Sequence, residues 1–278
     1  MRDLLPNEQT LRDYIQGKIL ETYRASGFER ISTPMLEDME NLDKSDGGDN
    51  LNLIFKVLKR GDKLTAALNS GDPKELSDMG LRYDLTLPLS RFYAANKDKL
   101  PHPFKVIQTD RVFRAERPQK GRLRQFHQVG TEWLGAPDPA ADAECIIMLM
   151  EFYKRLGFDL SKLRLLINSM GDAQCRPAYR EQVKQFILDH ADEMCDECRE
   201  RAELNPLRAF DCKNDHCREI MAEAPLMGDN LCDECREHYE QVKRYLDAAG
   251  IEYVEDPTLV RGLDYYTCLL YTSDAADD

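Results

Sequence analysis

Apolar residues recur every three to four positions near the start of the chain. This spacing places them on one face of a helix, and we therefore expect a helix over residues 8–26. Gly27 follows directly and is a typical stop signal. The apolar positions of this helix are Leu11, Ile15, Ile19 and Tyr23. The next segment, FERISTP, predicts a short strand that ends at Pro34.

Later segments alternate between apolar and polar positions or form short apolar runs, which are patterns of strands. Strands are expected at residues 51–58, 81–86, 105–117, 122–135 and 162–169. Helices are expected at residues 87–96, 140–157, 179–191 and 234–249. The segment PQKG at 118–121 predicts a turn between the two longest strands.

The second of these long strands presents an unusual set of side chains. Because alternate residues of a strand share a face, six of them are expected side by side: Arg122, Arg124, Phe126, Gln128, Gly130 and Glu132. Arginine can hold phosphate oxygens through two hydrogen bonds, and its plane can stack on a base. A sheet with this face suits a planar ligand that carries phosphates, although a solvated basic hairpin is the simpler alternative.

Charge makes this region stand out further. Residues 105–128 contain seven Lys and Arg against two acidic residues, whereas the whole chain of 278 residues has a net charge of −13. An acidic chain does not bind nucleic acid indiscriminately, so an RNA partner would have to meet local basic patches. The chain has no apolar run near the roughly 18 residues of a membrane span and no secretory signal, which favours a cytoplasmic location and no membrane partner.

Six of the nine cysteines crowd into residues 195–235, within a predicted helical insertion at 170–257. Two CDEC segments supply four thiols in C-x₂-C pairs, which can bind Zn²⁺ tetrahedrally. The candidate zinc ligands are Cys195, Cys198, Cys232 and Cys235. Reduced, inert thiols in a small helical module are the alternative.

Four segments resemble motifs of the histidyl-tRNA synthetases, in the order of that family. FRAERPQKGRLRQFHQ (113–128) resembles motif 2, LVRGLDYYT (259–267) resembles the histidine-recognition motif, and LRYDLT (81–86) resembles the strand that holds the substrate amino group. The N-terminal RDLLP is also similar. The first helix and strand resemble motif 1, which builds the dimer interface of class II synthetases; an ordinary helix–strand unit would look the same.

This resemblance implies an α+β fold, with a mostly antiparallel sheet flanked by helices and a mainly helical insertion. It implies a histidine–tRNA ligase that activates L-histidine with ATP and Mg²⁺ to histidyl-adenylate. The adenylate then acylates the 3′ end of tRNA(His). The family also implies a homodimer.

The resemblance assigns roles to individual residues. Arg114 and Arg261 are the expected catalytic phosphate clamps, and Arg114, Glu116 and Arg122 the expected ATP ligands. The expected histidine-binding residues are Asp84, Leu85, Thr86, Arg114, Gln128, Glu132, Arg261, Tyr265 and Tyr266. From the residues alone, Asp84 could equally be a helix N-cap, and residues 259–267 could be a tyrosine-rich core strand.

The resemblance is expected to end at Thr267, where the chain continues CLLYTSDAADD instead of an apolar strand. The expected organisation is a catalytic core at 1–169, the insertion at 170–257 and a return to the core at 258–278, without motif 3 or an anticodon-binding domain. These features indicate a truncated or mis-assembled reading frame, which puts the activity of the polypeptide and the stability of its sheet in question, because missing strands leave exposed edges.

Two other functions fit parts of this pattern. The regulatory paralogue of ATP phosphoribosyltransferase resembles the same core and has no anticodon domain, but it usually loses the arginines that are present here. A synthetase-like sensor of uncharged tRNA is the third reading, and such proteins normally carry extra domains.

Overall fold

The computed structural model describes residues 3–42, 53–117, 122–260 and 267–275. The chain forms two compact units, Met1–Ala136 and Pro137–Asp278. Three three-stranded sheets are present in these ranges, with the orders β1-β5-β6, β2-β4-β3 and β8-β7-β9. Four of the six strand pairings among the described residues are antiparallel. The α+β prediction is confirmed.

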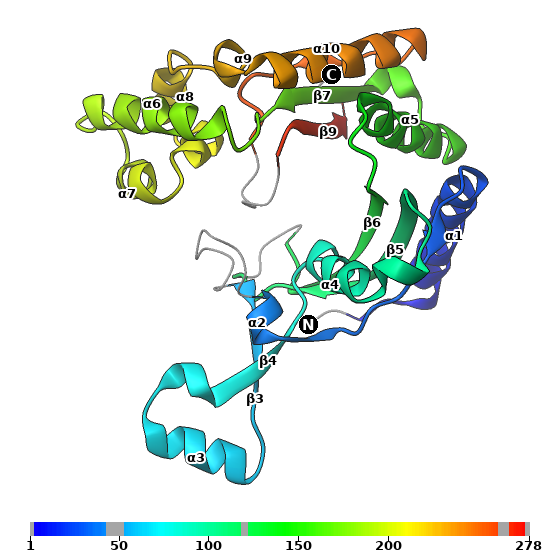
Figure 1. Cartoon of the computed structure of the whole chain (residues 1–278), viewed down its shortest axis with the longest axis vertical. Helices are drawn as coiled ribbons and strands as arrows, with labels where there is room; N and C mark the ends of the chain where they lie inside the picture. The colour runs from blue at the N-terminus through cyan, green and yellow to red at the C-terminus, as the bar shows by residue number, and fades with distance from the viewer. Residues whose placement is uncertain (1–2, 43–52, 118–121, 261–266, 276–278) are drawn as a thin grey trace. The chain divides into compact units, whose positions relative to one another are not determined.

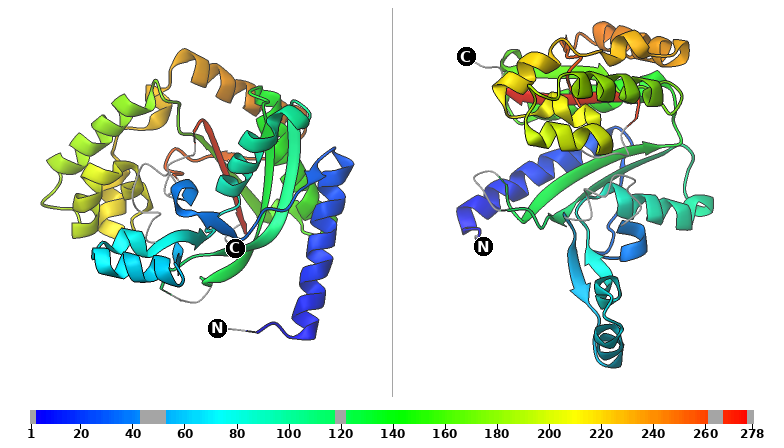
Figure 2. Two further views of the ribbon diagram at one scale, coloured as in Figure 1. Left: turned by 60° about the horizontal axis from the view of Figure 1, so that its bottom comes forward. Right: turned by 90° about the vertical axis from the view of Figure 1, so that its left-hand side faces the viewer.

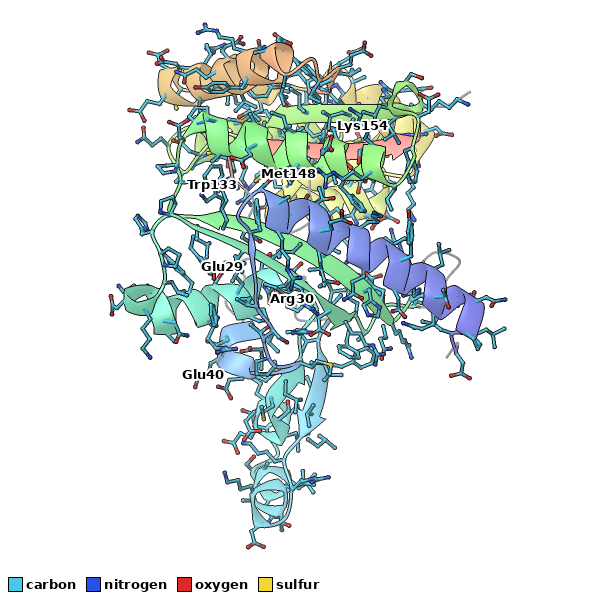
Figure 3. The ribbon with its side chains drawn as sticks, turned by 90° about the vertical axis from the view of Figure 1, so that its right-hand side faces the viewer. Glu29, Arg30, Glu40, Trp133, Met148 and Lys154 are labelled. Atoms are coloured by element: carbon cyan, nitrogen blue, oxygen red, sulfur yellow. The ribbon has the colours of Figure 1, made fainter. Side chains whose placement is uncertain are left out.

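The first unit is built on one long antiparallel pair. Strands β5 (Phe104–Phe113) and β6 (Gln125–Leu134) pair along their whole length, and the short strand β1 (Glu29–Arg30) adds to β5 in parallel. Helix α1 (Pro6–Ala25) lies along this sheet, as Figures 2 and 3 show. Its C-terminal half packs inward through Ile19 and Tyr23.

The second sheet of this unit carries a projecting hairpin. Its strands are β2 (Leu36–Asp38), β4 (Ser77–Leu81) and β3 (Phe55–Leu58). Helix α3 (Asp62–Ser70) and the 3₁₀ helix η2 (Pro73–Leu76) connect β3 to β4 at the far end of the hairpin (Figure 1). The remaining helices of the unit are α2 (Met39–Leu42), α4 (Thr86–Asn96) and the 3₁₀ helix η3 (Lys97–Lys99).

The second unit contains the third sheet, with strands β7 (Leu163–Ser169), β8 (Val254–Glu255) and β9 (Leu269–Ala275). Helices α5 (Pro139–Arg155) and α10 (Asp233–Ala248) pack on it and on each other (Figure 1). A 3₁₀ helix, η4 (Leu160–Lys162), leads into β7. The shared core consists of Ala143, Ile146, Leu165, Ile167, Val242 and Leu246.

Short helices fill the rest of the second unit. They are α6 (Arg176–Asp189), α7 (Asp196–Leu204), η5 (Pro206–Asp211), α8 (Asp215–Met221) and α9 (Met227–Asn230). Their common core contains aliphatic residues and several buried cysteines. None of the described helices combines the length and the apolar composition that a membrane crossing requires.

Most predicted elements are present, and their ends differ for local reasons. The predicted strand at 81–86 is wrong: β4 ends at Leu81, where the backbone turns away toward α4. The predicted strand at 122–135 begins only at Gln125, and FERISTP contributes only β1. The predicted boundaries at 169 and 257 do not coincide with the two units, because α5 and β7 pack with the helices that follow them.

Candidate functional site

Asp84 lies in the connection between β4 and α4 and is buried, with 3% of its surface exposed. Its Oδ1 accepts a hydrogen bond of 2.6 Å from the amide of Thr86, the first residue of α4. Its Oδ2 accepts a hydrogen bond of 3.1 Å from Nε2 of Gln128 on β6. Asp84 therefore satisfies the first amide of α4 with one oxygen and faces β6 with the other, but the N-cap residue of α4 is Leu85, so the interpretation of Asp84 as the N-cap is wrong.

Glu132 lies on the same face of β6, four residues after Gln128. Its Oε1 accepts a hydrogen bond of 3.2 Å from Oγ1 of Thr86. Burial is the main cause that raises the pKa of Glu132; the Thr86 hydroxyl opposes the rise and the Asp84 carboxylate adds to it. A cation bound between the two carboxylates would stabilise the ionised form of Glu132 and so oppose the rise of its pKa.

Gly130 faces the segment 84–86, with room for a methyl group between them. A Cβ atom at Gly130 would lie 3.5 Å from Cβ of Leu85. The face of β6 that was predicted from alternation therefore carries Gln128, Gly130 and Glu132 against Asp84–Thr86. We call the side chains of Asp84, Thr86, Gln128 and Glu132 the acidic cluster.

One polar atom of the acidic cluster has no partner. The Oε1 atom of Gln128 is buried and accepts no hydrogen bond from any described residue. An unpaired buried acceptor costs about 1–3 kcal/mol and calls for an explanation. Together with the carboxylate of Asp84 it offers acceptors to a donor such as an ammonium group, which has three N–H bonds.

Arg114 follows the end of β5 and is held close to this cluster. Its Nε donates a hydrogen bond of 3.1 Å to the carbonyl oxygen of Tyr83, the residue before Asp84. Its guanidinium carbon lies 5.1 Å from the centre of the Phe126 ring, within the range of a cation–π contact. These contacts use Nε and one face of the group, which leaves the Nη atoms to meet an anionic ligand.

The other predicted ATP ligands lie at the same end of the β5–β6 pair. Glu116 is half-buried, and its carbonyl oxygen accepts a hydrogen bond of 3.0 Å from Nε of Arg124. Arg122 is exposed and precedes β6. The segment 118–121, with the predicted turn, lies outside the described residues.

Arg82 and Gln108, which the sequence pattern did not single out, hold the segments next to the acidic cluster. Arg82 is fully buried, and its Nη2 lies 2.8 Å from Oδ2 of Asp110. Its Nη1 donates to the carbonyl and hydroxyl oxygens of Thr33 at 2.8 and 3.0 Å. Gln108 accepts from the Thr33 hydroxyl at 3.1 Å and donates to the carbonyl oxygen of Leu85 at 3.3 Å.

This network explains two polar positions on β5. Burial opposes ionisation of Asp110, but hydrogen bonds from Arg82 and the Arg111 amide outweigh it and lower the pKa of Asp110. Gln108 and Asp110 alternate with Val106 and Val112 in a strand that is otherwise apolar on this face. These two polar residues on an apolar strand face were the sequence signal that could have revealed this buried hydrogen-bond network.

Three predicted site residues are not placed. Arg261, Tyr265 and Tyr266, expected to clamp phosphate and to line the imidazole pocket, lie outside the described residues. Their roles stay predictions.

The cysteine prediction is wrong in its grouping. The two CDEC segments do not share a site, because the thiols of each lie within 4.8 Å of a different set of side chains. Each segment instead meets partners from elsewhere in the second unit. One group is Cys195, Cys198, Cys212 and Cys217; the other is Asp172, Cys175, Cys232 and Cys235. Burial, followed by the neighbouring thiols of Cys212 and Cys195, raises the pKa of Cys198.

The antiparallel β5–β6 pair with α1 along it belongs to the fold of the class II aminoacyl-tRNA synthetases. The family model described as histidyl-tRNA synthetase matches residues 1–273. The chain belongs to the histidyl-tRNA synthetase family. The match continues to Ser273, so the expectation that the resemblance ends at Thr267 is wrong.

Curated relatives agree with this assignment. The chain is 40% identical over 270 residues to the histidine–tRNA ligase of Desulforamulus reducens, covering 95% of this chain and 60% of the relative. It is 41% identical over 271 residues to that of Desulforudis audaxviator, with the same two shares. The chain thus spans about 60% of the length of these relatives.

Solved structures support the fold. The crystal structure of apo histidyl-tRNA synthetase from S. aureus is similar with a TM-score of 0.70 at 30% identity, over 98% of this chain and 60% of that one. A structure named as an ATP phosphoribosyltransferase regulatory subunit/histidyl-tRNA synthetase from Bacillus halodurans reaches a TM-score of 0.67 at 22% identity, over 99% of this chain and 71% of that one. At that identity it supports the fold alone.

Proposed function

We propose that the chain carries the catalytic core of a histidine–tRNA ligase. L-Histidine and ATP, which enters with Mg²⁺ as part of the substrate, form histidyl-adenylate and pyrophosphate. The histidyl group then passes to the 3′ end of tRNA(His). The observation that supports this best is the acidic cluster, in which Asp84, Glu132 and the unpartnered Oε1 of Gln128 converge.

The cluster offers the chemistry that a zwitterionic amino acid requires. An α-ammonium group donates three hydrogen bonds, and Asp84 and Gln128 accept them without rearrangement of Thr86, which Asp84 already orients. Glu132 can accept from an imidazole N–H. A pocket built from buried hydrogen-bonding groups rejects side chains that leave those groups unpaired, often by a factor of about 10⁴.

Arginines would supply the electrostatic part of the first step. The carboxylate of histidine attacks the α-phosphate of ATP, so negative charge gathers between the two reactants. Arg114, oriented by the Tyr83 carbonyl and the Phe126 ring, would bind both of them. Arg122 would meet the distal phosphates, Glu116 the amino group of adenine, and Arg261 the α-phosphate. No protein nucleophile is needed, since positioning and charge neutralisation carry the reaction.

Assembly and location complete the proposal. We infer a homodimer in the cytoplasm, as the family implies. The N-terminal half of α1 and the residues before it expose apolar side chains that a second copy could cover: Leu4, Leu5, Leu11 and Tyr14. Zinc would be a structural ion of the second unit and would take no part in the reaction.

Two measurements test the function. Calorimetric titration of the chain should show saturable binding of L-histidine and none of L-glutamine or L-tyrosine. In a version extended to the full length of its relatives, histidine-dependent exchange of pyrophosphate into ATP should occur, and it should be lost in Arg261→Ala while histidine binding is retained. Equal binding of the three amino acids would refute the pocket, and exchange that persists in Arg261→Ala would refute the role of that arginine.

The regulatory reading remains the second candidate, and it makes a different prediction. A binding subunit would bind histidine without histidine-dependent exchange. The arginines favour the ligase, because the Tyr83 carbonyl orients Arg114 beside the acidic cluster, and histidine binding alone does not need an α-phosphate clamp.

A further inference from the structure

The hexapeptide CDECRE occurs twice in the second unit, at residues 195–200 and 232–237. Each copy begins on the residue that precedes a helix, Cys195 before α7 and Cys232 before α10. The backbone angles agree closely: φ −67° and ψ 159° at Cys195, φ −65° and ψ 162° at Cys232. In both copies the first carbonyl accepts from the amide four residues on. The copies therefore present their thiols in the same way.

Other segments complete a group of four around the first copy. Cys212 follows η5 and Cys217 lies in α8, and they meet Cys195 and Cys198. The four sulfur atoms all lie within 4.8 Å of one another, and Sγ of Cys195 is 3.8 Å from Sγ of Cys212. Cys198 and Cys217 are fully buried, and Cys212 is 5% exposed.

These distances match a single tetrahedral ion. With Zn–S bonds of about 2.3 Å, the sulfurs of a tetrahedron are roughly 3.8 Å apart. An iron–sulfur cluster would hold its thiolates much further apart, because metal and sulfide ions lie between them. The amide of Cys195 also donates to Sγ of Cys217 at 3.3 Å, a contact typical of the outer shell of a thiolate ligand.

The second copy has its own partners, in a separate place. Cys175 directly precedes α6, and its Sγ lies 4.0 Å from Sγ of Cys235. Asp172 lies with them, and its Oδ2 is 4.0 Å from Sγ of Cys232. Its Oδ1 accepts hydrogen bonds from the amides of Gln174 and Cys175, which fix the carboxylate. All the ligand atoms again lie within 4.8 Å of one another.

We propose that the second unit binds two structural zinc ions, one at Cys195, Cys198, Cys212 and Cys217, the other at Asp172, Cys175, Cys232 and Cys235. Each site joins segments that no long strand or helix connects. The first holds α7, η5 and α8 together, and the second joins the start of α6 to the start of α10 across 60 residues. Four-coordinate sites without an open position are the structural kind of zinc site. This inference is independent of the ligase proposal.

Metal content of the whole chain tests the proposal directly. The chain should be produced without a histidine tag in zinc-supplied cells and dialysed against EDTA. Elemental analysis should find two zinc ions per chain. Cys198→Ser and Cys235→Ser should each retain one and the double variant none, while Cys145→Ser, a cysteine of α5 outside both groups, should retain both.

The wild-type chain supplies a test that needs no variant. Cobalt substitution should give the intense charge-transfer absorption of thiolate-bound Co²⁺ and the visible bands of tetrahedral coordination. Zinc X-ray absorption should fit seven sulfur ligands and one oxygen over the two ions, with Zn–S of about 2.3 Å. Removal of zinc with a stronger chelator should lower the melting temperature, and added Zn²⁺ should restore it.

Each other outcome counts against a defined part of the proposal. Zinc that dialysis removes without any change in melting temperature would overturn both sites. If the wild-type chain retains only one zinc ion, the serine variants identify the wrong site. The site whose serine variant leaves that zinc content unchanged would be overturned. A zinc shell rich in nitrogen would show that histidines bind the metal instead and would overturn the ligand assignment.

Discussion

The carboxylate of Asp84 and the side-chain amide of Gln128 are joined by a hydrogen bond of 3.1 Å, although 44 residues separate them in the chain. This bond orients the amide so that its carbonyl oxygen is buried without a partner. The pair therefore offers a buried acceptor to the donor of a ligand. Its strength as a binding element can be measured by substitution at either end.

Gln128→Ala should weaken binding of L-histidine by about tenfold to a hundredfold, since a hydrogen bond to a charged group contributes about 1.5–3 kcal/mol. Gln125→Ala is the matched control, because Gln125 lies on β6 but is exposed on the alternate position. Calorimetry on the three proteins gives the comparison. Equal affinities for the wild type and Gln128→Ala would mean that the amide does not contact the ligand.

Glu132→Gln should stabilise the ligand-free chain near neutral pH while it weakens histidine binding. The folded state raises the pKa of Glu132 above its ordinary value of about 4.3, mainly through burial. Its contribution to stability is therefore fully present below about pH 4.3 and is lost as the pH rises through the raised pKa.

The free energy of unfolding, measured with urea from about pH 4 to about pH 7, should thus fall less steeply with rising pH in Glu132→Gln than in the wild type. Glu29→Gln, at an exposed position of β1, serves as the control and should follow the wild type. If the free energy of unfolding falls equally steeply with pH in all three proteins, burial of the Glu132 carboxylate does not lower stability as we infer.

Gly130 should tolerate alanine but not valine. A Cβ at this position makes ordinary contact with Leu85 at 3.5 Å, whereas the two further methyl groups of valine must displace the 84–86 segment or distort β6. We expect Gly130→Ala to keep histidine affinity within about threefold and Gly130→Val to lose about tenfold or more. The melting temperatures of both variants separate loss of the site from loss of the fold.

Arg91→Ala should destabilise the first unit by about 3 kcal/mol, because Glu37 would remain buried without its partner. Arg91 on α4 donates from Nε to both carboxylate oxygens of Glu37 on β2, at 2.9 and 2.8 Å, and Glu37 is 4% exposed. Urea unfolding at neutral pH measures the loss.

The double variant Glu37→Gln with Arg91→Ala should recover part of that stability, since no charge is then buried. A double variant that is as unstable as Arg91→Ala alone would point to lost packing of the arginine side chain rather than to the unpaired charge.

Local patterns predicted those parts of this fold that depend on neighbours in sequence. The helical spacing around Ile19 and Tyr23 predicted α1, and the apolar run at 162–169 predicted β7. Alternation placed Gln128 and Glu132 on one face of β6 before any contact was known, because a strand has a fixed period of two. The strand expected at 81–86 overlaps β4 only at Leu81, and β4 itself was not predicted. The sequence did not predict that the Asp84 carboxylate would contact both the Thr86 amide and the Gln128 side chain.

The sequence by itself therefore determined most of the elements, the face of β6 and the family, since these follow from spacing and motif. It did not identify Asp172 and Cys175 as neighbours of the second CDEC segment. Tertiary structure alone decided which residues meet. It paired the buried Arg82, two residues before Asp84, with Asp110. It also assigned the two identical CDEC segments to separate groups of potential metal ligands. The physical reason is that hydrogen bonds and metal sites need atoms within a few ångströms, and the path of the chain between distant segments depends on how whole helices and strands pack.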